Sequence, residues 1–165
     1  LAHVKNKRFT HAALGYRYQM TNIQAALGLV SLSHIQESIK RKRSMAAYYF
    51  NHLHTIPGII TPVEKPWAKS VYWMYAIRVI NTMYGVSRDV FMNNMSKHGI
   101  QTRSFFYAPK TAFKRMRSFK HVDAPIAERC EKEGVYLPSG LDITKQELLY
   151  VIKNINDNYK ACEKY

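Results

Sequence analysis

A chain of 165 residues, 47% hydrophobic and 22% charged, can bury a core, which excludes an intrinsically disordered protein. No apolar run approaches the roughly 18 residues that a membrane span needs, and two cysteines, Cys130 and Cys162, form neither a disulfide framework nor a metal cluster. The formal net charge of +14 admits a polyanionic partner, although the basic residues are spread along the chain. We expect one domain of ordinary size, with free thiols in a reducing cytoplasm, no membrane span and no metal site.

The first third of the chain predicts a tight hairpin followed by a long helix. Residues 15–20 read GYRYQM, an aromatic and basic turn. Thr21 and Gln24 then have the spacing of a capping box, which marks a helix N-terminus. Apolar residues recur at helical spacing from Ile23 to Leu53, so a single helix is predicted over about 22–54. The Ile-Pro-Gly sequence at 56–58 ends it.

The same helix contains the run Lys40-Arg41-Lys42-Arg43. Four consecutive positions of a helix point in several directions, so the run predicts a solvated helix face rather than one concentrated anion site. The alternative, a nucleic-acid interface, has no accompanying recognition motif in the sequence.

The remainder predicts three strands that alternate with helices. The strands are expected over 71–80, 100–106 and 135–137, after an extended connector at 59–66. Helices are expected to begin after three N-cap residues, Ser87, Asp123 and Thr144. The fold class is therefore α/β: a long N-terminal helix followed by a small three-stranded layer with helices on one face. Spacing leaves open whether the strands run parallel or mixed.

Five segments in order resemble one enzyme family. The first, GYRYQMTNIQAALG at 15–28, resembles the GYNYRMTNIQAALG segment of the DegT/DnrJ/EryC1/StrS family of pyridoxal-phosphate sugar aminotransferases, most closely its perosamine synthase-like branch. The others are VYWMY, GIQTRSFFY, DAPIAE and LPSG, at 71–75, 99–107, 123–128 and 137–140. Each motif is weak alone, but the ordered set covers essentially the whole chain.

The resemblance implies the C-terminal portion of such an enzyme. Residues 1–21 would be a hairpin segment from the edge of the large domain, 22–56 the connecting helix, and 57–165 the small C-terminal α/β domain of a fold-type I aminotransferase. In the family, the lysine that holds pyridoxal phosphate as a Schiff base lies in the large domain, before the position that matches residue 1. The isolated chain is therefore expected to be inactive, and no catalytic residue is assigned to it.

Two residues of the hairpin match family positions that reach the cofactor of the partner subunit. Arg17 stands where the family has Asn, and Gln19 stands where it has Arg. Arg17 can still meet a phosphate with two donors, whereas Gln19 is neutral. Cofactor binding by both residues is what the resemblance implies; the alternative is that both are exposed hairpin residues without that role.

On the substrate side, Arg103 and Tyr107 match the family pattern, and Lys110 takes the place of a histidine. Lysine binds a diphosphate as a point charge but cannot act as a neutral imidazole near pH 7. The resemblance implies substrate binding by all three, while Arg103 could equally form a surface ion pair.

Two functions follow from these observations. The first is amination of a nucleotide-linked keto-sugar, with glutamate as amino donor, by a homodimer that serves surface polysaccharide or lipopolysaccharide O-antigen synthesis. The second is a non-catalytic remnant or basic module that binds a sugar nucleotide, an intact aminotransferase or nucleic acid. If the chain stands alone, an exposed apolar stripe is expected on the long helix.

Overall fold

The computed structural model describes residues 16, 18–109 and 123–159. They belong to two compact units, residues 1–37 and 38–165, which are taken in turn. The boundary between the two units, after residue 37, lies inside a helix. It differs from the expected domain boundaries after residues 21 and 56, and those boundaries stay a prediction.

The first unit contains helix α1 (Asn22–Ser33), and its N-terminus confirms the predicted capping box. The Thr21 hydroxyl accepts from the Gln24 amide at 3.3 Å, and the Gln24 side chain accepts from the Thr21 amide at 2.9 Å. The helix stops at His34, and α2 (Ile35–Leu53) begins there, so the prediction of one unbroken helix was wrong at this point. The hydroxyls of Ser31 and Ser33 donate to carbonyls of the preceding turn, a competition that weakens a helix.

The Ile-Pro-Gly sequence at 56–58 was predicted to end the long helix. This prediction is confirmed, because α2 ends at Leu53, just before that sequence. Gly58 has a φ of +81°, in the left-handed region that favours glycine. A Cβ atom at this position would lie 2.4 Å from the backbone nitrogen of Tyr84. Only glycine therefore fits the turn that leads from α2 into the sheet.

The described part of the second unit contains four strands rather than the three predicted. They are β1 (Ile59–Ile60), β2 (Tyr75–Val79), β3 (Arg103–Ser104) and β4 (Gly134–Leu137). Their order is β1-β2-β4-β3, and every neighbouring pair is antiparallel. Strand β1 was missed because two residues between a glycine turn and prolines carry no period-2 pattern. The strands predicted over 71–80 and 100–106 are shorter than expected.

In the described residues of this unit, four shorter helices connect and cover the strands: α3 (Asn81–Tyr84), α4 (Arg88–Lys97), α6 (Pro125–Glu133) and α7 (Lys145–Asp157). The N-caps Ser87 and Thr144 are confirmed. Asp123 is not a cap, because α6 begins at Pro125 and the N-cap is Ala124, which makes no side-chain cap bond. A residue before proline is held out of the helical region, so the cap falls one residue later than expected.

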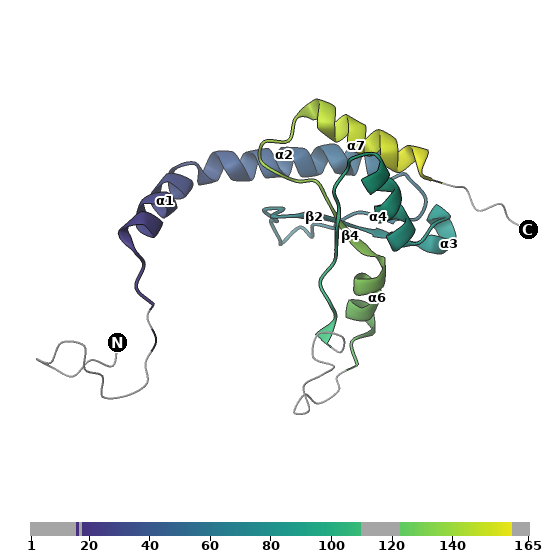
Figure 1. The fold of residues 1–165 in the computed structure, drawn as a ribbon, viewed down its shortest axis with the longest axis horizontal. Helices are drawn as coiled ribbons and strands as arrows, with labels where there is room; N and C mark the ends of the chain where they lie inside the picture. The colour runs from purple at the N-terminus through teal and green to yellow at the C-terminus, as the bar shows by residue number, and fades with distance from the viewer. Residues whose placement is uncertain (1–15, 17, 110–122, 160–165) are drawn as a thin grey trace, which may run out of the picture. The chain divides into compact units, whose positions relative to one another are not determined.

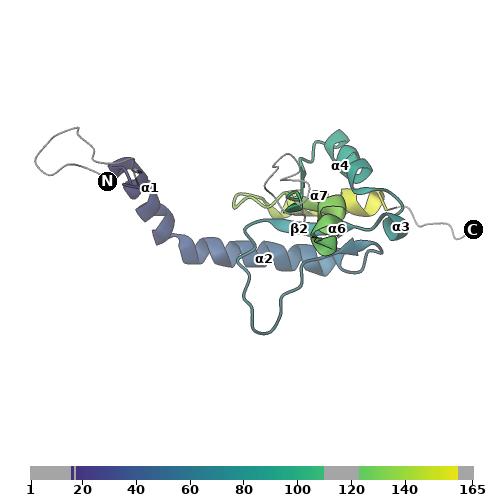
Figure 2. The same cartoon turned by 90° about the horizontal axis from the view of Figure 1, so that it is seen from below.

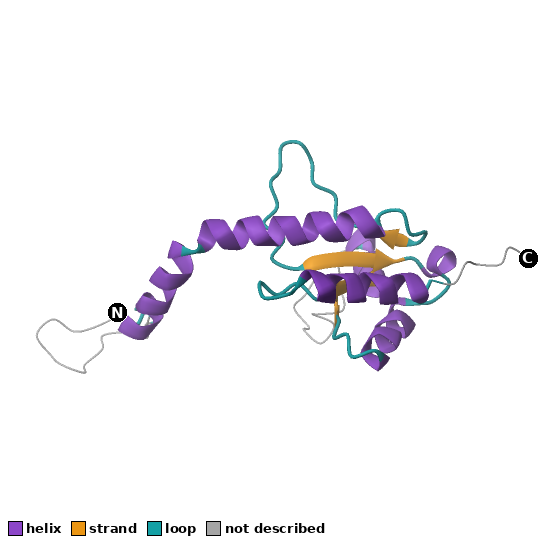
Figure 3. Ribbon diagram, turned by 90° about the horizontal axis from the view of Figure 1, so that it is seen from above, coloured by secondary structure: helices purple, strands orange, loops and turns teal. Residues whose placement is uncertain are grey.

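The core lies on one face of the sheet. Tyr75, Ile77 and Val79 of β2 are buried there, whereas the alternate residues Ala76 and Arg78 are half-buried on the other face. Helices α2 and α7 lie side by side over the core face, as Figure 1 and Figure 3 show from two directions. The ring of Tyr49 in α2 stacks on Tyr75, with ring centroids 4.9 Å apart. Arg78, on the opposite face, donates to Glu133 of α6, so the prediction of helices on one face only was wrong.

The connection between β1 and β2 is a long loop at residues 61–74 that projects beside α2 (Figure 2). Its side chains Val63, Trp67 and Trp73 are exposed. No helix in the described part of the chain is both long and apolar enough to cross a bilayer.

Candidate functional site

The expected cofactor residues lie in the first unit. Gln19 is exposed, two residues before the cap of α1. Arg17 lies outside the described residues. Tyr16 and Tyr18 are both exposed, and their rings stack with centroids 5.9 Å apart. Gln19 is therefore accessible to a ligand, and its cofactor role stays a prediction.

Arg103 occupies the edge strand β3, where it pairs in register with Tyr136 of the central strand β4. Its guanidinium carbon lies 5.7 Å from the centroid of the Phe106 ring, a cation–π geometry. Among the described residues, Arg103 has no carboxylate partner, so the alternative of a surface ion pair is not seen. The Arg103 guanidinium is exposed and packs on the Phe106 ring, so it is available to bind an anion.

Aromatic side chains support this edge of the sheet. The Phe105 ring stacks on Tyr136 at 5.1 Å, and the Phe106 ring meets the same tyrosine edge-on at 6.0 Å. Burial raises the pKa of the Tyr136 hydroxyl, and the charge of Arg103 acts in the opposite direction. The packing holds the backbone that carries Arg103 in a fixed place.

Tyr107 continues from this cluster and is 71% exposed. The next amide, that of Ala108, donates to the Glu131 carboxylate of α6 at 2.9 Å, which ties the segment to the domain. Lys110 lies outside the described residues. The structure therefore places Arg103 and Tyr107 on one exposed segment, and the substrate role of the three residues stays a prediction.

The basic run of α2 differs from its prediction. Lys40 and Arg41 are exposed as expected, but Lys42 donates to the carbonyl of Trp73 at 3.0 Å and to that of Ser139. Arg43 forms a two-pronged ion pair with Glu64, at 2.8 and 3.1 Å. The prediction of a fully solvated face was thus wrong for half of the run. The signal was present, because position 42 precedes the core positions Met45 and Tyr49 by three and seven residues.

Comparison with known proteins identifies the family. The sequence matches the DegT/DnrJ/EryC1/StrS aminotransferase family over residues 1–156. The chain therefore belongs to that family, and the resemblance seen in its motifs is confirmed.

Individual relatives agree with this assignment. The GDP-perosamine synthase of Escherichia coli O157:H7 is 32% identical over 154 residues, which cover 93% of this chain and 40% of that protein. The spore coat polysaccharide biosynthesis protein SpsC of Bacillus subtilis is 25% identical over 152 residues, 90% of this chain and 39% of that protein. The crystal structure of the aminotransferase TlmJ from Streptoalloteichus hindustanus superposes with a TM-score of 0.76 at 26% identity, covering 90% of this chain and 39% of that one. The chain thus spans about 40% of the length of the relatives it matches.

The described residues do not by themselves fit a pyridoxal phosphate site. A Schiff-base lysine needs a free amine in a pocket that encloses the ring. The half-buried Lys42 has its pKa lowered by burial, but its ammonium donates to two backbone carbonyls. Lys145 lies 5.8 Å from the Tyr48 ring and is exposed, as are the other described lysines. No lysine in the described part of the chain therefore fits the role of the Schiff-base lysine.

Proposed function

We propose that the chain is the C-terminal part of a pyridoxal-phosphate-dependent aminotransferase that aminates a nucleotide-linked keto-sugar. The family match over residues 1–156 is the observation that carries this proposal. The name of the relative GDP-perosamine synthase supports a sugar nucleotide as substrate, and the name of SpsC supports a role in polysaccharide biosynthesis. The proposal also includes glutamate as the amino donor and a homodimer as the active form. The product would be used in the synthesis of surface polysaccharide or lipopolysaccharide O-antigen.

In this proposal the chain binds rather than reacts. Arg103, which rests on Phe106, would meet a phosphate of the sugar nucleotide, with Tyr107 beside it and Lys110 following in the sequence. Arg17 and Gln19 would reach the cofactor phosphate of a partner subunit. We expect the chain alone to have no turnover, because in the family the Schiff-base lysine lies in the large domain.

A chimera tests the proposal directly. Residues 1–156 would replace the matching segment of the E. coli GDP-perosamine synthase, and amino transfer from glutamate would be measured. We expect the chimera to retain activity. Arg103→Ala in the chimera should raise KM for the sugar nucleotide by about tenfold, because a charge-assisted bond to phosphate is lost. Arg129→Ala, an arginine of α6, is the matched control and should leave KM unchanged.

The isolated chain supplies the second half of the test. It would be mixed with pyridoxal phosphate, reduced with borohydride and analysed by mass spectrometry. We expect no specific adduct. A stoichiometric adduct on one lysine of this chain would contradict the assignment of the catalytic lysine to the large domain.

The non-catalytic alternative, a basic binding module, is favoured by one observation, the net charge of +14. A folded chimera that binds the sugar nucleotide but transfers no amino group would favour this alternative.

A further inference from the structure

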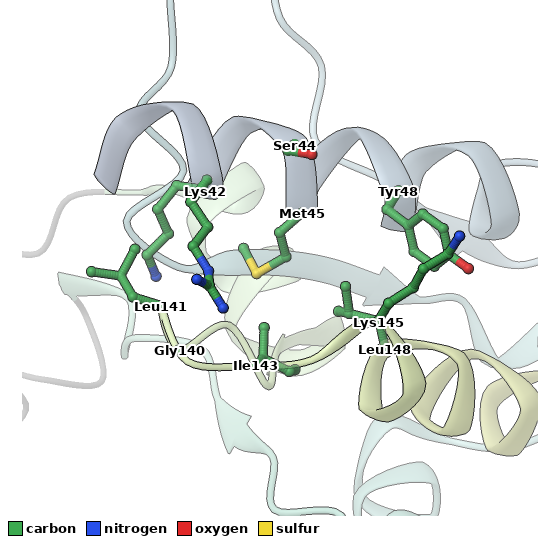
Figure 4. A pocket seen from close by; sticks show the side chains of 10 residues that line it. Lys42, Ser44, Met45, Tyr48, Gly140, Leu141, Ile143, Lys145 and Leu148 are labelled. Carbon is green, nitrogen blue, oxygen red and sulfur yellow. The ribbon is translucent and has the colours of Figure 1, made fainter. Parts of the chain in front are cut away.

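A cavity of about 340 Å³ lies between α2 and the start of α7. In Figure 4, Lys42 extends from α2 toward the loop at Leu141, Met45 points into the middle, and Lys145 extends toward Tyr48. Arg41 also lines the cavity. The whole cavity belongs to the second unit, so it is complete within one compact body.

The charge of this cavity is one-sided. Three cations line it, two from α2 and one from α7, and no carboxylate does so among the described residues. Two acids, Asp142 and Glu147, stand next to lining residues in sequence, and the Glu147 carboxylate accepts from the Thr144 amide at 2.7 Å and from its hydroxyl at 2.8 Å. Both acids line a neighbouring hollow that shares Gly140 and Ile143 with this cavity. A concave surface lined by one sign of charge concentrates counter-ions of the other sign.

Two of the cations are available to a ligand. Arg41 and Lys145 are exposed, and neither has a carboxylate partner among the described residues. Lys42 differs because its ammonium holds the carbonyls of Trp73 and Ser139, so it contributes charge from a fixed position. The lining of the cavity therefore carries two accessible cations and one positive charge held in a fixed position.

The floor of the cavity is apolar. Met45 and Leu148 are buried in the core, and Ile143 packs against it. Ligand pockets commonly combine such an apolar lining with a few convergent polar groups, and a volume near 340 Å³ is at the small end of their range. The lining suits an anion that carries a compact apolar portion.

We propose that this cavity, between α2 and α7, binds a compact phosphate-bearing small molecule, with its phosphate in the positive field of Arg41, Lys42 and Lys145 and its apolar portion over Met45 and Leu148. The inference does not depend on amino transfer, because Gln19, Arg103 and Tyr107, the predicted binding residues that the structure describes, do not line the cavity. The proposal also gives a binding role to Arg41, which belongs to the basic run that the sequence analysis predicted to be a solvated helix face.

Methyl NMR of the 165-residue chain tests the site, with the Met45 methyl as local reporter and Met45→Leu to assign it. The probes are phenyl phosphate, inorganic phosphate and phenol, each titrated at constant ionic strength. We expect phenyl phosphate to shift the Met45 signal and saturate it. Inorganic phosphate and phenol should each bind about tenfold more weakly, because each lacks one half of the recognised ligand.

Matched variants separate the site from general surface charge. Arg41→Ala and Lys145→Ala should each weaken phenyl phosphate binding by about fivefold, the range expected for one exposed charge pair. Lys40→Ala on α2 and Lys153→Ala on α7 are the controls, since both lysines are exposed and lie outside the cavity. Arg41→Gln and Lys145→Gln repeat the test with longer side chains that preserve the helices.

Three results would overturn the proposal. The first is a Met45 signal that does not respond to phenyl phosphate. The second is equal weakening by the control variants, which would indicate a non-specific basic surface. The third is phenol binding as tightly as phenyl phosphate, which would indicate an apolar hollow without an anion site.

Discussion

Two buried tyrosine hydroxyls differ in their hydrogen bonding. The Tyr84 hydroxyl donates to the Ile155 carbonyl at 2.5 Å, which joins α3 to α7 through the core. The Tyr75 hydroxyl is buried without a partner among the described residues, although its ring stacks on Tyr49. A buried polar group without a partner loses its bonds to water and gains none in return.

The two tyrosine-to-phenylalanine variants should therefore change stability in opposite directions. Tyr84→Phe removes a donor and leaves a buried carbonyl unpaired, so we expect a loss of about 1 to 2 kcal/mol in the free energy of unfolding. Tyr75→Phe keeps the ring and removes an unsatisfied hydroxyl, so it should be neutral or stabilising by up to about 1 kcal/mol. Urea unfolding measures both; a clear loss in Tyr75→Phe would show that its hydroxyl has a partner.

Glu64 gives the domain a defined response to acid. Hydrogen bonds from Arg43 and from the Ser70 amide lower the pKa of this carboxyl from 4.5 to about 2. A pKa lowered by folding stabilises the folded state above the ordinary value, and that contribution is lost as the pH falls from about 4.5 toward 2. The pairing holds the 61–74 loop to α2, so acid should loosen this loop.

Glu64→Gln should be less stable than the parent at pH 7, and the difference should shrink as the pH falls from 4.5 to 2. Urea midpoints at several pH values measure this convergence. Glu37→Gln is the control, because Glu37 is an exposed carboxylate of α2. A Glu64→Gln deficit of equal size at pH 2 and pH 7 would contradict the assigned ionisation.

At the scale of whole elements, α1 lacks a covered face in the described structure. No residue from Asn22 to Ser33 is charged, and none is buried. Its large exposed apolar residues are Ile23, Leu27, Leu29, Val30 and Leu32. A helix that is apolar all round is usually found inside a protein, so α1 should seek a partner surface in solution. The expected exposed stripe is thus seen on α1, whereas α2 buries its own stripe in the core.

The isolated chain should consequently self-associate. Sedimentation velocity at increasing concentration should show species larger than a monomer, and Leu27→Gln with Val30→Gln should shift the distribution toward the monomer. Ile126→Gln, on the exposed surface of α6, is the control and should leave the distribution unchanged. A monomeric parent chain at high concentration would contradict the role given to α1.

The elements that were predictable from the sequence depend on contacts between residues close in sequence, whereas the others depend on contacts between distant residues. Capping boxes at Thr21 and Thr144 were predictable because the cap and its partner are three residues apart in sequence. Strand β1 was not predictable, because its two residues become a strand only by pairing with β2, about twenty residues later. The tie from Lys42 to Ser139 joins residues 97 positions apart. Of the expected site, Arg103 was predicted on a strand from local pattern and lies on β3, whereas the substrate roles of Arg103 and Tyr107 stay predictions.

At the scale of the molecule, the second unit contains the core. Every buried residue of the described structure lies between Met45 and Ile155, within that unit. The stability of a domain comes mainly from its buried apolar residues, so removal of a segment that buries none should cost little.

A chain that begins at residue 38 should therefore fold by itself. It keeps the part of α2 that carries Met45, Ala46, Tyr49 and Leu53, and its thermal midpoint should stay within about 5 °C of the full chain. It should also be monomeric, since α1 has been removed. A chain that begins at residue 50 is the matched control: it loses three of those four core side chains and should not unfold cooperatively. Circular dichroism melts compare the three chains, and a non-cooperative melt of the 38–165 chain would show that the first unit contributes to the core's stability after all.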